Sequence, residues 1–154
     1  MHTQSRTSLD ESALKARQEL EALAVEYWYE IDVHGGGNAH LFYTEDATFT
    51  TSLKSRRGHD EIRAFYAART ERGPRLSLHI VQNFRAVLIS PTLAHCDYVM
   101  SLYAADGEPI LPSRPAIMIA RATERVVRER EGSPWRYAER TLTPLFRDDT
   151  PTTG

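Results

Sequence analysis

The stretch EYWYEIDVH, residues 26–34, is followed directly by three glycines at 35–37. Glycine carries the largest backbone entropy penalty of the common helix residues, so the glycines predict that a helix ends here. Three aromatic rings then lie close to the carboxylate of Asp32 in the last helical turn. A helix end of this kind can direct Asp32 into a cavity, and the groups that meet it there have to come from the rest of the chain.

A helical pattern leads into this stretch from the N-terminal side. The sequence SLDE at residues 8–11 has the form of a capping box, which predicts a helix start near Leu9. Apolar residues then recur at helical spacing and predict one buried stripe: Leu20, Leu23, Ala24, Tyr27 and Ile31. We expect residues 1–8 to form a flexible N-terminus.

The residues after the glycines predict a short helical turn, a strand and a second helix. The helical turn covers residues 39–43, and residues 47–51, ATFTT, have the β-branched and aromatic content of a strand. The second helix opens at residues 58–60 and is closed by the Gly-Pro pair at 73–74. Its amphipathic pattern places four side chains along one stripe: Ile62, Phe65, Tyr66 and Arg69.

The remainder of the chain has the period-two pattern of β-strands. Strand candidates cover residues 76–89, 92–103, 115–130 and 135–145, with turn signals between them. Helices followed by consecutive strands predict an α+β domain in which the N-terminal helices pack on one face of a curved, mixed or antiparallel sheet. We expect one domain over residues 9–146 and a disordered tail over residues 147–154.

Composition and charge argue against several classes of partner. The 19 basic and 21 acidic residues are well mixed, which predicts no nucleic-acid and no membrane partner. The polar N-terminus and the lack of an 18-residue apolar run predict a cytoplasmic protein. Cys96 is the only cysteine, and His34 and His40 have a poor spacing for metal ligands, so we expect no metal site.

His79 is the first candidate for chemistry in the strand pattern. Strand alternation places His79, Val81 and Asn83 on one face, and both faces of this strand carry apolar residues. A histidine within reach of a carboxylate would be held in one tautomer and made more basic. His79 is therefore either a catalytic base or a hydrogen-bonded histidine of the core.

Arg140 is the second candidate, because it lies between apolar neighbours in the middle of the last strand. An arginine in such a place must find an acceptor or reach water. It could bind a substrate anion or contact Asp32. The alternative is a structural ion pair with Glu139, Asp97 or another acid.

The layout of these elements resembles the nuclear transport factor two superfamily. That fold is a cone-shaped, cystatin-like α+β barrel and includes SnoaL-like polyketide cyclases, ketosteroid isomerase and scytalone dehydratase. The resemblance covers residues 10–146. It is carried by Tyr27 and Asp32 and by three stretches: FYTEDATF at 42–49, LHIVQN at 78–83 and WRYAER at 135–140.

Within that superfamily the chain is most similar to the branch with an aspartate in helix one and a histidine in strand two. Scytalone dehydratase, the bile-acid dehydratase and the hexachlorocyclohexane dehydrochlorinase belong to this branch. The resemblance implies that Asp32 and His79 form an acid–base dyad for an elimination. It also implies that Tyr27 lies at the pocket mouth and that Arg140 matches an arginine of the last strand. Ala104 stands near the position of the second histidine of scytalone dehydratase, which argues against scytalone itself as substrate.

The resemblance implies a cofactor-independent, dehydratase-like lyase or isomerase that acts on a small apolar cyclic substrate. His79 would remove a proton, Tyr27 would donate to a carbonyl or a leaving hydroxyl, and Arg140 would stabilise negative charge. The expected substrate-binding residues are those with apolar or amide side chains near the dyad: Trp28, Phe49, Phe65, Tyr66, Val81, Asn83, Tyr98, Met100 and Met118.

A non-catalytic protein is the alternative interpretation. The spacing of His79 and Asn83 also resembles the small subunit of ring-hydroxylating dioxygenases, which shares the fold and does no chemistry itself. The chain would then be a ligand-binding protein or an assembly subunit. The resemblance implies a homodimer formed through the outer face of the sheet, and a higher assembly or a hetero-oligomer is the alternative. On that face we expect four apolar side chains: Val99, Tyr103, Ile117 and Ile119.

Overall fold

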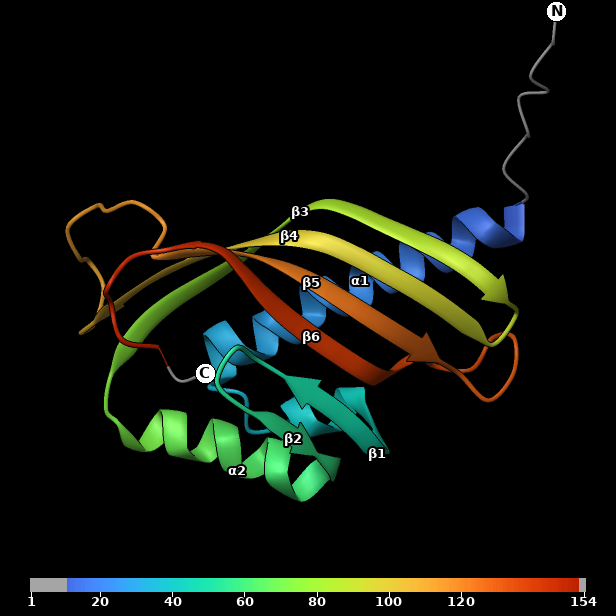
Figure 1. Ribbon diagram of the computed structural model, residues 1–154, viewed down its shortest axis with the longest axis horizontal. Helices are drawn as coiled ribbons and strands as arrows, with labels where there is room; N and C mark the ends of the chain where they lie inside the picture. Colours follow the sequence, from blue (N-terminus) through green and yellow to red (C-terminus); the bar gives the residue numbers. More distant parts are fainter. Residues whose placement is uncertain (1–10, 153–154) are drawn as a thin grey trace, which may run out of the picture.

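The computed structural model describes residues 11–152, which form two α-helices, a short 3-10 helix and one six-stranded sheet (Figure 1). In chain order the elements are α1 (Glu11–His34), η1 (Ala39–Phe42), β1 (Tyr43–Thr50), β2 (Ser55–Arg57), α2 (Gly58–Glu71), β3 (Arg75–Ser90), β4 (Leu93–Asp106), β5 (Met118–Val127) and β6 (Arg136–Arg147). The predicted α+β class is confirmed. Residues 1–10, which include the predicted flexible N-terminus and most of the capping box, lie outside the described residues. Within residues 11–152 no helix combines the length and the apolar character needed to cross a membrane.

The sheet has the strand order β2-β1-β6-β5-β4-β3. Strands β3 to β6 form the antiparallel meander that the turn signals predict. Strand β1 pairs in parallel with β6 and antiparallel with β2, which makes the sheet mixed. Sequence analysis missed the three-residue β2 and began β1 at residue 47 instead of Tyr43. Both elements are held by pairing with distant strands, which local patterns do not reveal.

Helix α1 packs along β3, and α2 packs against β1 and η1, as Figure 1 shows. The apolar stripe predicted for the first helix is confirmed, and the buried residues of α1 are Ala16, Leu20, Ala24, Tyr27, Trp28 and Ile31. In α2 the buried residues are Ile62 and Tyr66. The two helices and the inner face of the sheet therefore enclose one core, with α1 in contact with the strand that carries His79.

Helix α1 ends where the glycines predict. Gly35 and Gly36 have φ angles of 72° and 79°, in the left-handed region that favours glycine. The Gly36 amide donates to the carbonyl of Glu30 at 3.1 Å. A Cβ on Gly36 would lie 2.7 Å from Cδ1 of Tyr66, so no larger residue fits there without movement of that ring. This sharp end leaves Asp32 in the last turn of α1, in contact with β3.

A β-bulge in β3 changes which residues share a face. The pairing with β4 shifts after Gln82, and Asn83 has a φ angle of 54°. Asparagine tolerates this left-handed conformation better than most residues. The extra residue leaves Asn83 exposed and turns Phe84 into the core. The prediction of a shared face therefore holds for His79 and Val81 and is wrong for Asn83.

The chain after β6 contacts the residue before β5 and the Arg75 side chain at the start of β3. Arg147 belongs to β6, so the predicted disordered tail began too early. The Asp148 amide donates to the carbonyl of Ile117 at 3.0 Å, and Arg75 Nη2 donates to the carbonyl of Pro151 at 2.9 Å. The prediction rested on polar composition, which carries no information on such long-range contacts.

Candidate functional site

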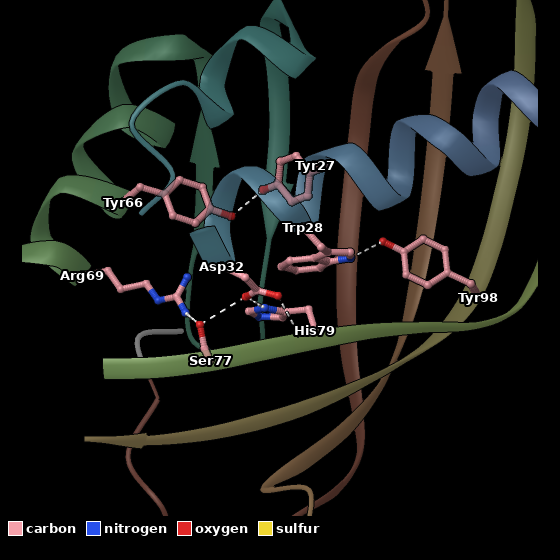
Figure 2. A network of polar contacts seen from close by, with 8 residues as sticks. All are labelled: Tyr27, Trp28, Asp32, Tyr66, Arg69, Ser77, His79 and Tyr98. Atoms are coloured by element: carbon pink, nitrogen blue, oxygen red, sulfur yellow. Dashed lines mark hydrogen bonds and ion pairs between the residues drawn. The ribbon is translucent and has the colours of Figure 1, made fainter. Parts of the chain in front are cut away.

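Asp32 and His79 meet between the end of α1 and the start of β3 (Figure 2). The Asp32 Oδ1 lies 2.6 Å from the His79 Nδ1, and the Asp32 Oδ2 accepts from the His79 backbone amide at 2.8 Å. Their side chains are 10% and 6% exposed, respectively. A carboxylate can only accept, so the neutral imidazole carries its proton on Nδ1 and keeps a lone pair on Nε2. The predicted contact between the two residues is present.

Trp28 fixes the plane of the His79 ring. The two rings stack with centroids 3.9 Å apart and planes inclined by 8°. The Trp28 Nε1 in turn donates to the hydroxyl of Tyr98 at 2.9 Å, which holds the indole in place. An aromatic face attracts a cation, so the indole can stabilise the imidazolium that forms when His79 takes up a proton.

Burial lowers the pKa of His79 below its ordinary value of 6.5, and the Asp32 carboxylate opposes this only in part. The positive charges of Arg69 and Arg140 add to the lowering. Sequence analysis expected a more basic histidine, which is wrong because the cost of desolvating the imidazolium outweighs the attraction to Asp32. His79 is therefore neutral at pH 7 and able to accept a proton.

Two further residues support the carboxylate. The Ser77 Oγ donates to Asp32 Oδ1 at 3.2 Å, and Arg69 Nη2 donates to Ser77 Oγ at 2.8 Å. An aspartate near a helix C-terminus is opposed by the helix dipole, and the donors around Asp32 offset this. Sequence analysis named neither Ser77 nor Arg69 as a site residue. The available signals were that Ser77 shares a strand face with His79 and that Arg69 continues the apolar stripe of α2.

His79 borders a small cavity between the two helices and the sheet. The cavity has a volume of about 60 Å³, and most of its lining is apolar: Trp28, Phe49, Thr51, Phe65, Tyr66, Arg69, Arg75, His79, Met100, Leu102, Ala104, Met118, Leu142 and Thr152. Space of this size holds a few water molecules and is well below the roughly 300 Å³ of a typical small-molecule pocket. The predicted substrate-binding residues that border it are Trp28, Phe49, Phe65, Tyr66, Met100 and Met118.

A wider polar groove adjoins this cavity. It has a volume of about 390 Å³ and is lined by Ile31, Asp32, Gly35, Arg69, Thr70, Gly73, Pro74, Arg75 and Ser77. Arg69 and Arg75 border both spaces, so the groove continues the cavity toward solvent. Asp32 lies on the groove side of the dyad and His79 on the cavity side. Among the described residues, no group of three or more His, Cys, Asp or Glu side chains could hold a metal ion.

Arg140 lies on the other side of Trp28 and does not border the cavity. Its side chain is 0% exposed, and its Nε donates to Glu124 Oε1 at 3.0 Å. Its Nη2 donates to the Tyr98 hydroxyl at 2.7 Å, and its guanidinium carbon lies 4.5 Å from the ring centroid of Trp28. These contacts favour the structural ion pair over a substrate-binding arginine, with Glu124 as the acid.

Four other predicted site residues also lie away from the cavity. Tyr27 is fully buried, its hydroxyl contacts that of Tyr66 (Figure 2), and burial raises the pKa of Tyr27 well above 10. It is therefore part of the core and not at a pocket mouth. Tyr98 is also fully buried, Val81 packs against the core, and Asn83 is exposed beyond the bulge. Strand alternation gave the inner face correctly for Val81 and Tyr98, but the cavity reaches only part of that face.

Comparison with known proteins identifies the fold. No family model and no curated protein matches the chain. A proposed scytalone dehydratase from Novosphingobium aromaticivorans has a similar structure, with a TM-score of 0.79 and 17% identity over 92% of this chain and 92% of that chain. ActVI-ORFA from Streptomyces coelicolor has a TM-score of 0.72 and 13% identity, covering 84% and 98% of the two chains. LinA has a TM-score of 0.70 and 16% identity, covering 91% and 97%.

The chain therefore shares a cone-shaped, cystatin-like α+β fold with these solved structures, which is the fold that the sequence resemblance implied. At identities of 13% to 17%, the likeness shows the fold alone. The function has to be argued from the residues of the site.

Proposed function

We propose that this protein is a cofactor-independent, dehydratase-like lyase or isomerase in which Asp32 and His79 carry out acid–base catalysis on a small cyclic substrate. The observation that carries the proposal is the 2.6 Å contact between Asp32 Oδ1 and His79 Nδ1. This contact occupies one ring nitrogen and leaves the other as the free base on a residue that borders the cavity. The structural likeness to a protein named as a dehydratase supports the same class of reaction.

In the proposed elimination, the His79 Nε2 removes the proton from the carbon next to a substrate carbonyl. The electron pair of the broken C–H bond forms an enolate. The enolate then collapses to a C=C bond and expels the hydroxyl group on the neighbouring carbon, which takes the proton from the imidazolium and leaves as water. Asp32 stabilises the imidazolium between the two steps, and His79 returns to its neutral form.

Arg69 is the group that we propose to stabilise the negative charge of the enolate. Sequence analysis gave this role to Arg140, whose guanidinium is enclosed in the core. Arg69 borders the cavity together with His79, and its contact with Ser77 holds it beside the dyad. A fixed cation near a developing oxyanion lowers the barrier, because it is already oriented before the charge appears.

The test uses 3-hydroxycyclohexanone and related cyclic β-hydroxy ketones, whose elimination yields a conjugated enone that absorbs in the ultraviolet. We expect His79→Gln to lower turnover by about 10²- to 10⁴-fold, the range typical of a lost general base. His95→Gln is the matched control, because His95 is exposed on β4. Equal turnover in the two variants would refute the proposal. Retained ligand binding with no turnover in the wild type would favour the non-catalytic alternative.

A further inference from the structure

Arginines cluster where the cavity meets the solvent. Arg69 and Arg75 border the cavity, the polar groove and a third depression of about 170 Å³ that also includes Arg72. Asp106 is the one acid in the lining of this third depression. On the groove side, the carboxylate of Asp32 is already engaged by the donors described above. The mouth of the site therefore carries an excess of positive charge.

The dipole of α2 explains only part of this cluster. Basic side chains are favoured at a helix C-terminus, and Arg69 and Arg72 lie at the end of α2. Arg75 belongs to β3 and owes nothing to that dipole. Its Nη1 lies 2.9 Å from Asp106 Oδ1, but the Asp106 side chain is 85% exposed, so this ion pair contributes little.

Arg75 also contacts the C-terminal segment of the chain. Its Nη2 donates to the backbone carbonyl of Pro151 at 2.9 Å, and the neighbouring Thr152 borders the cavity. A neutral carbonyl oxygen is a weaker partner for a guanidinium than a carboxylate, which accepts two parallel, charge-assisted hydrogen bonds. The Pro151 carbonyl therefore occupies a position where a substrate carboxylate would bind more strongly.

The size of the cavity also favours a substrate that extends to the mouth of the site. Its volume of about 60 Å³ is too small to enclose a cyclic substrate, whereas the adjoining groove measures about 390 Å³. A substrate that reaches His79 must therefore extend past Arg69 and Arg75. The nearby carboxylates of Asp32 and Asp106 favour a single negative charge at the mouth over the double charge of a phosphate.

We propose that the substrate is a ring compound with a carboxylate, which Arg75 binds at the mouth, and that the ring lies in the groove while its reacting carbon extends past Arg69 to His79. This inference rests on the proposed function and specifies its substrate class. On binding, the carboxylate displaces the Pro151 carbonyl from Arg75. The site thus selects ring acids over neutral ring compounds of the same shape.

The experiment compares the binding of cyclohexanecarboxylate and cyclohexanecarboxamide to the full-length chain, followed by NMR shifts at pH 7. The two probes have nearly the same shape and differ in charge. We expect the carboxylate to bind about tenfold more tightly, as a charge-assisted contact should, and Arg75→Gln to abolish this preference. Arg63→Gln is the matched control, because Arg63 is also an arginine but is exposed on α2. Its ion pair with Asp60 is long, at 3.8 Å. Asp106→Asn should strengthen carboxylate binding, because it removes a negative charge 2.9 Å from Arg75.

Equal binding of the two probes to the wild type, or binding of neither, would overturn the inference. A preference that persists in Arg75→Gln would do the same. If Arg75→Gln does not fold, Asp106→Asn provides the test instead. A carboxylate preference in Asp106→Asn equal to that of the wild type would count against the inference. His79→Gln separates the two proposals, because it should keep the carboxylate preference while turnover is lost.

Discussion

Two polar networks lie on opposite sides of Trp28, and they differ in what each leaves unused. On one side, Trp28 stacks on His79, which gives one ring nitrogen to Asp32 and borders the cavity. On the other side, Arg140 and Glu124 form an ion pair whose side chains are 0% and 1% exposed. A charged group in a core indicates chemistry only when an unused polar atom reaches space that a ligand can enter. By that criterion the Asp32–His79 network is the candidate for the proposed catalysis and the Arg140–Glu124 network is structural.

The structural network shows why a buried charge needs its partner. Burial raises the pKa of Glu124, and Arg140 opposes this rise by attraction and hydrogen bonding. Four aromatic rings surround the guanidinium: Tyr27, Trp28, Phe49 and Tyr137. Such contacts favour a cation that has lost its water. The network therefore stabilises the fold as long as it is complete, and it becomes costly when one member is missing.

The largest effect that we expect is the loss of stability in Arg140→Gln, which disrupts the Arg140–Glu124 network. Removal of one partner of a buried ion pair leaves the other charge uncompensated, which costs roughly 3–5 kcal/mol of unfolding free energy. Urea denaturation measures this cost. Arg121→Gln is the control, because the ion pair of Arg121 with Asp97 is partly exposed and should contribute at most about 1 kcal/mol.

A double variant tests the same explanation. Combining Glu124→Gln with Arg140→Met removes both charges, so we expect it to be more stable than Arg140→Gln alone. If Arg140→Gln costs no more than Arg121→Gln, the buried pair does not carry the stability assigned to it. Arg140 would then have to be reconsidered as a functional group.

A smaller effect, on the pKa of His79, is expected in the Asp32–His79 network. The Asp32 carboxylate raises the pKa of His79, whereas burial lowers it by more. Asp32→Asn removes the raising contribution and keeps the burial, so the pKa of His79 should fall further below 6.5. In turnover, the loss of activity on acidification should then move to lower pH, because the base has to be neutral.

NMR titration of the His79 imidazole in the wild type and in Asp32→Asn measures this shift. Asp97→Asn is the control, because Asp97 pairs with Arg121 on an exposed part of the sheet. An unchanged His79 pKa in Asp32→Asn would contradict the coupling of the dyad. A pKa that rises would mean that the histidine has become more accessible to water.

Some parts of the site can be predicted from the sequence and others cannot. The glycine stop after α1 and the alternation along β3 placed Asp32 at a helix end and His79 on a covered strand face, whereas the family resemblance implied that the two residues meet. The same reasoning put Arg140 on the inner face correctly, but it could not tell which side of Trp28 that position occupies. Arg69 and Ser77 were missed because their contact depends on where the end of α2 lies relative to β3. Such packing is decided by the whole chain and leaves no local pattern.

The outer face of the sheet provides the last test, because a change there should affect neither network. We propose that two copies pair through this face, where Ile80 of β3, Ile119 of β5 and Phe146 of β6 lie in one row across the sheet. Ile80 and Phe146 are exposed, whereas Ile117, which was expected on this surface, is buried.

We expect Ile80→Glu to shift the protein from dimer to monomer in sedimentation experiments, because a charge on an apolar contact must be desolvated when the two faces meet. Val25→Glu is the control, since Val25 is exposed on α1, away from the sheet surface. A wild-type protein that sediments as a monomer at micromolar concentration would contradict the dimer. His79 is next to Ile80 but points to the opposite face of β3, so its titration should be the same in the monomeric variant. If the His79 pKa does move, the two faces are coupled through the strand, and the dimer interface would influence the Asp32–His79 network directly.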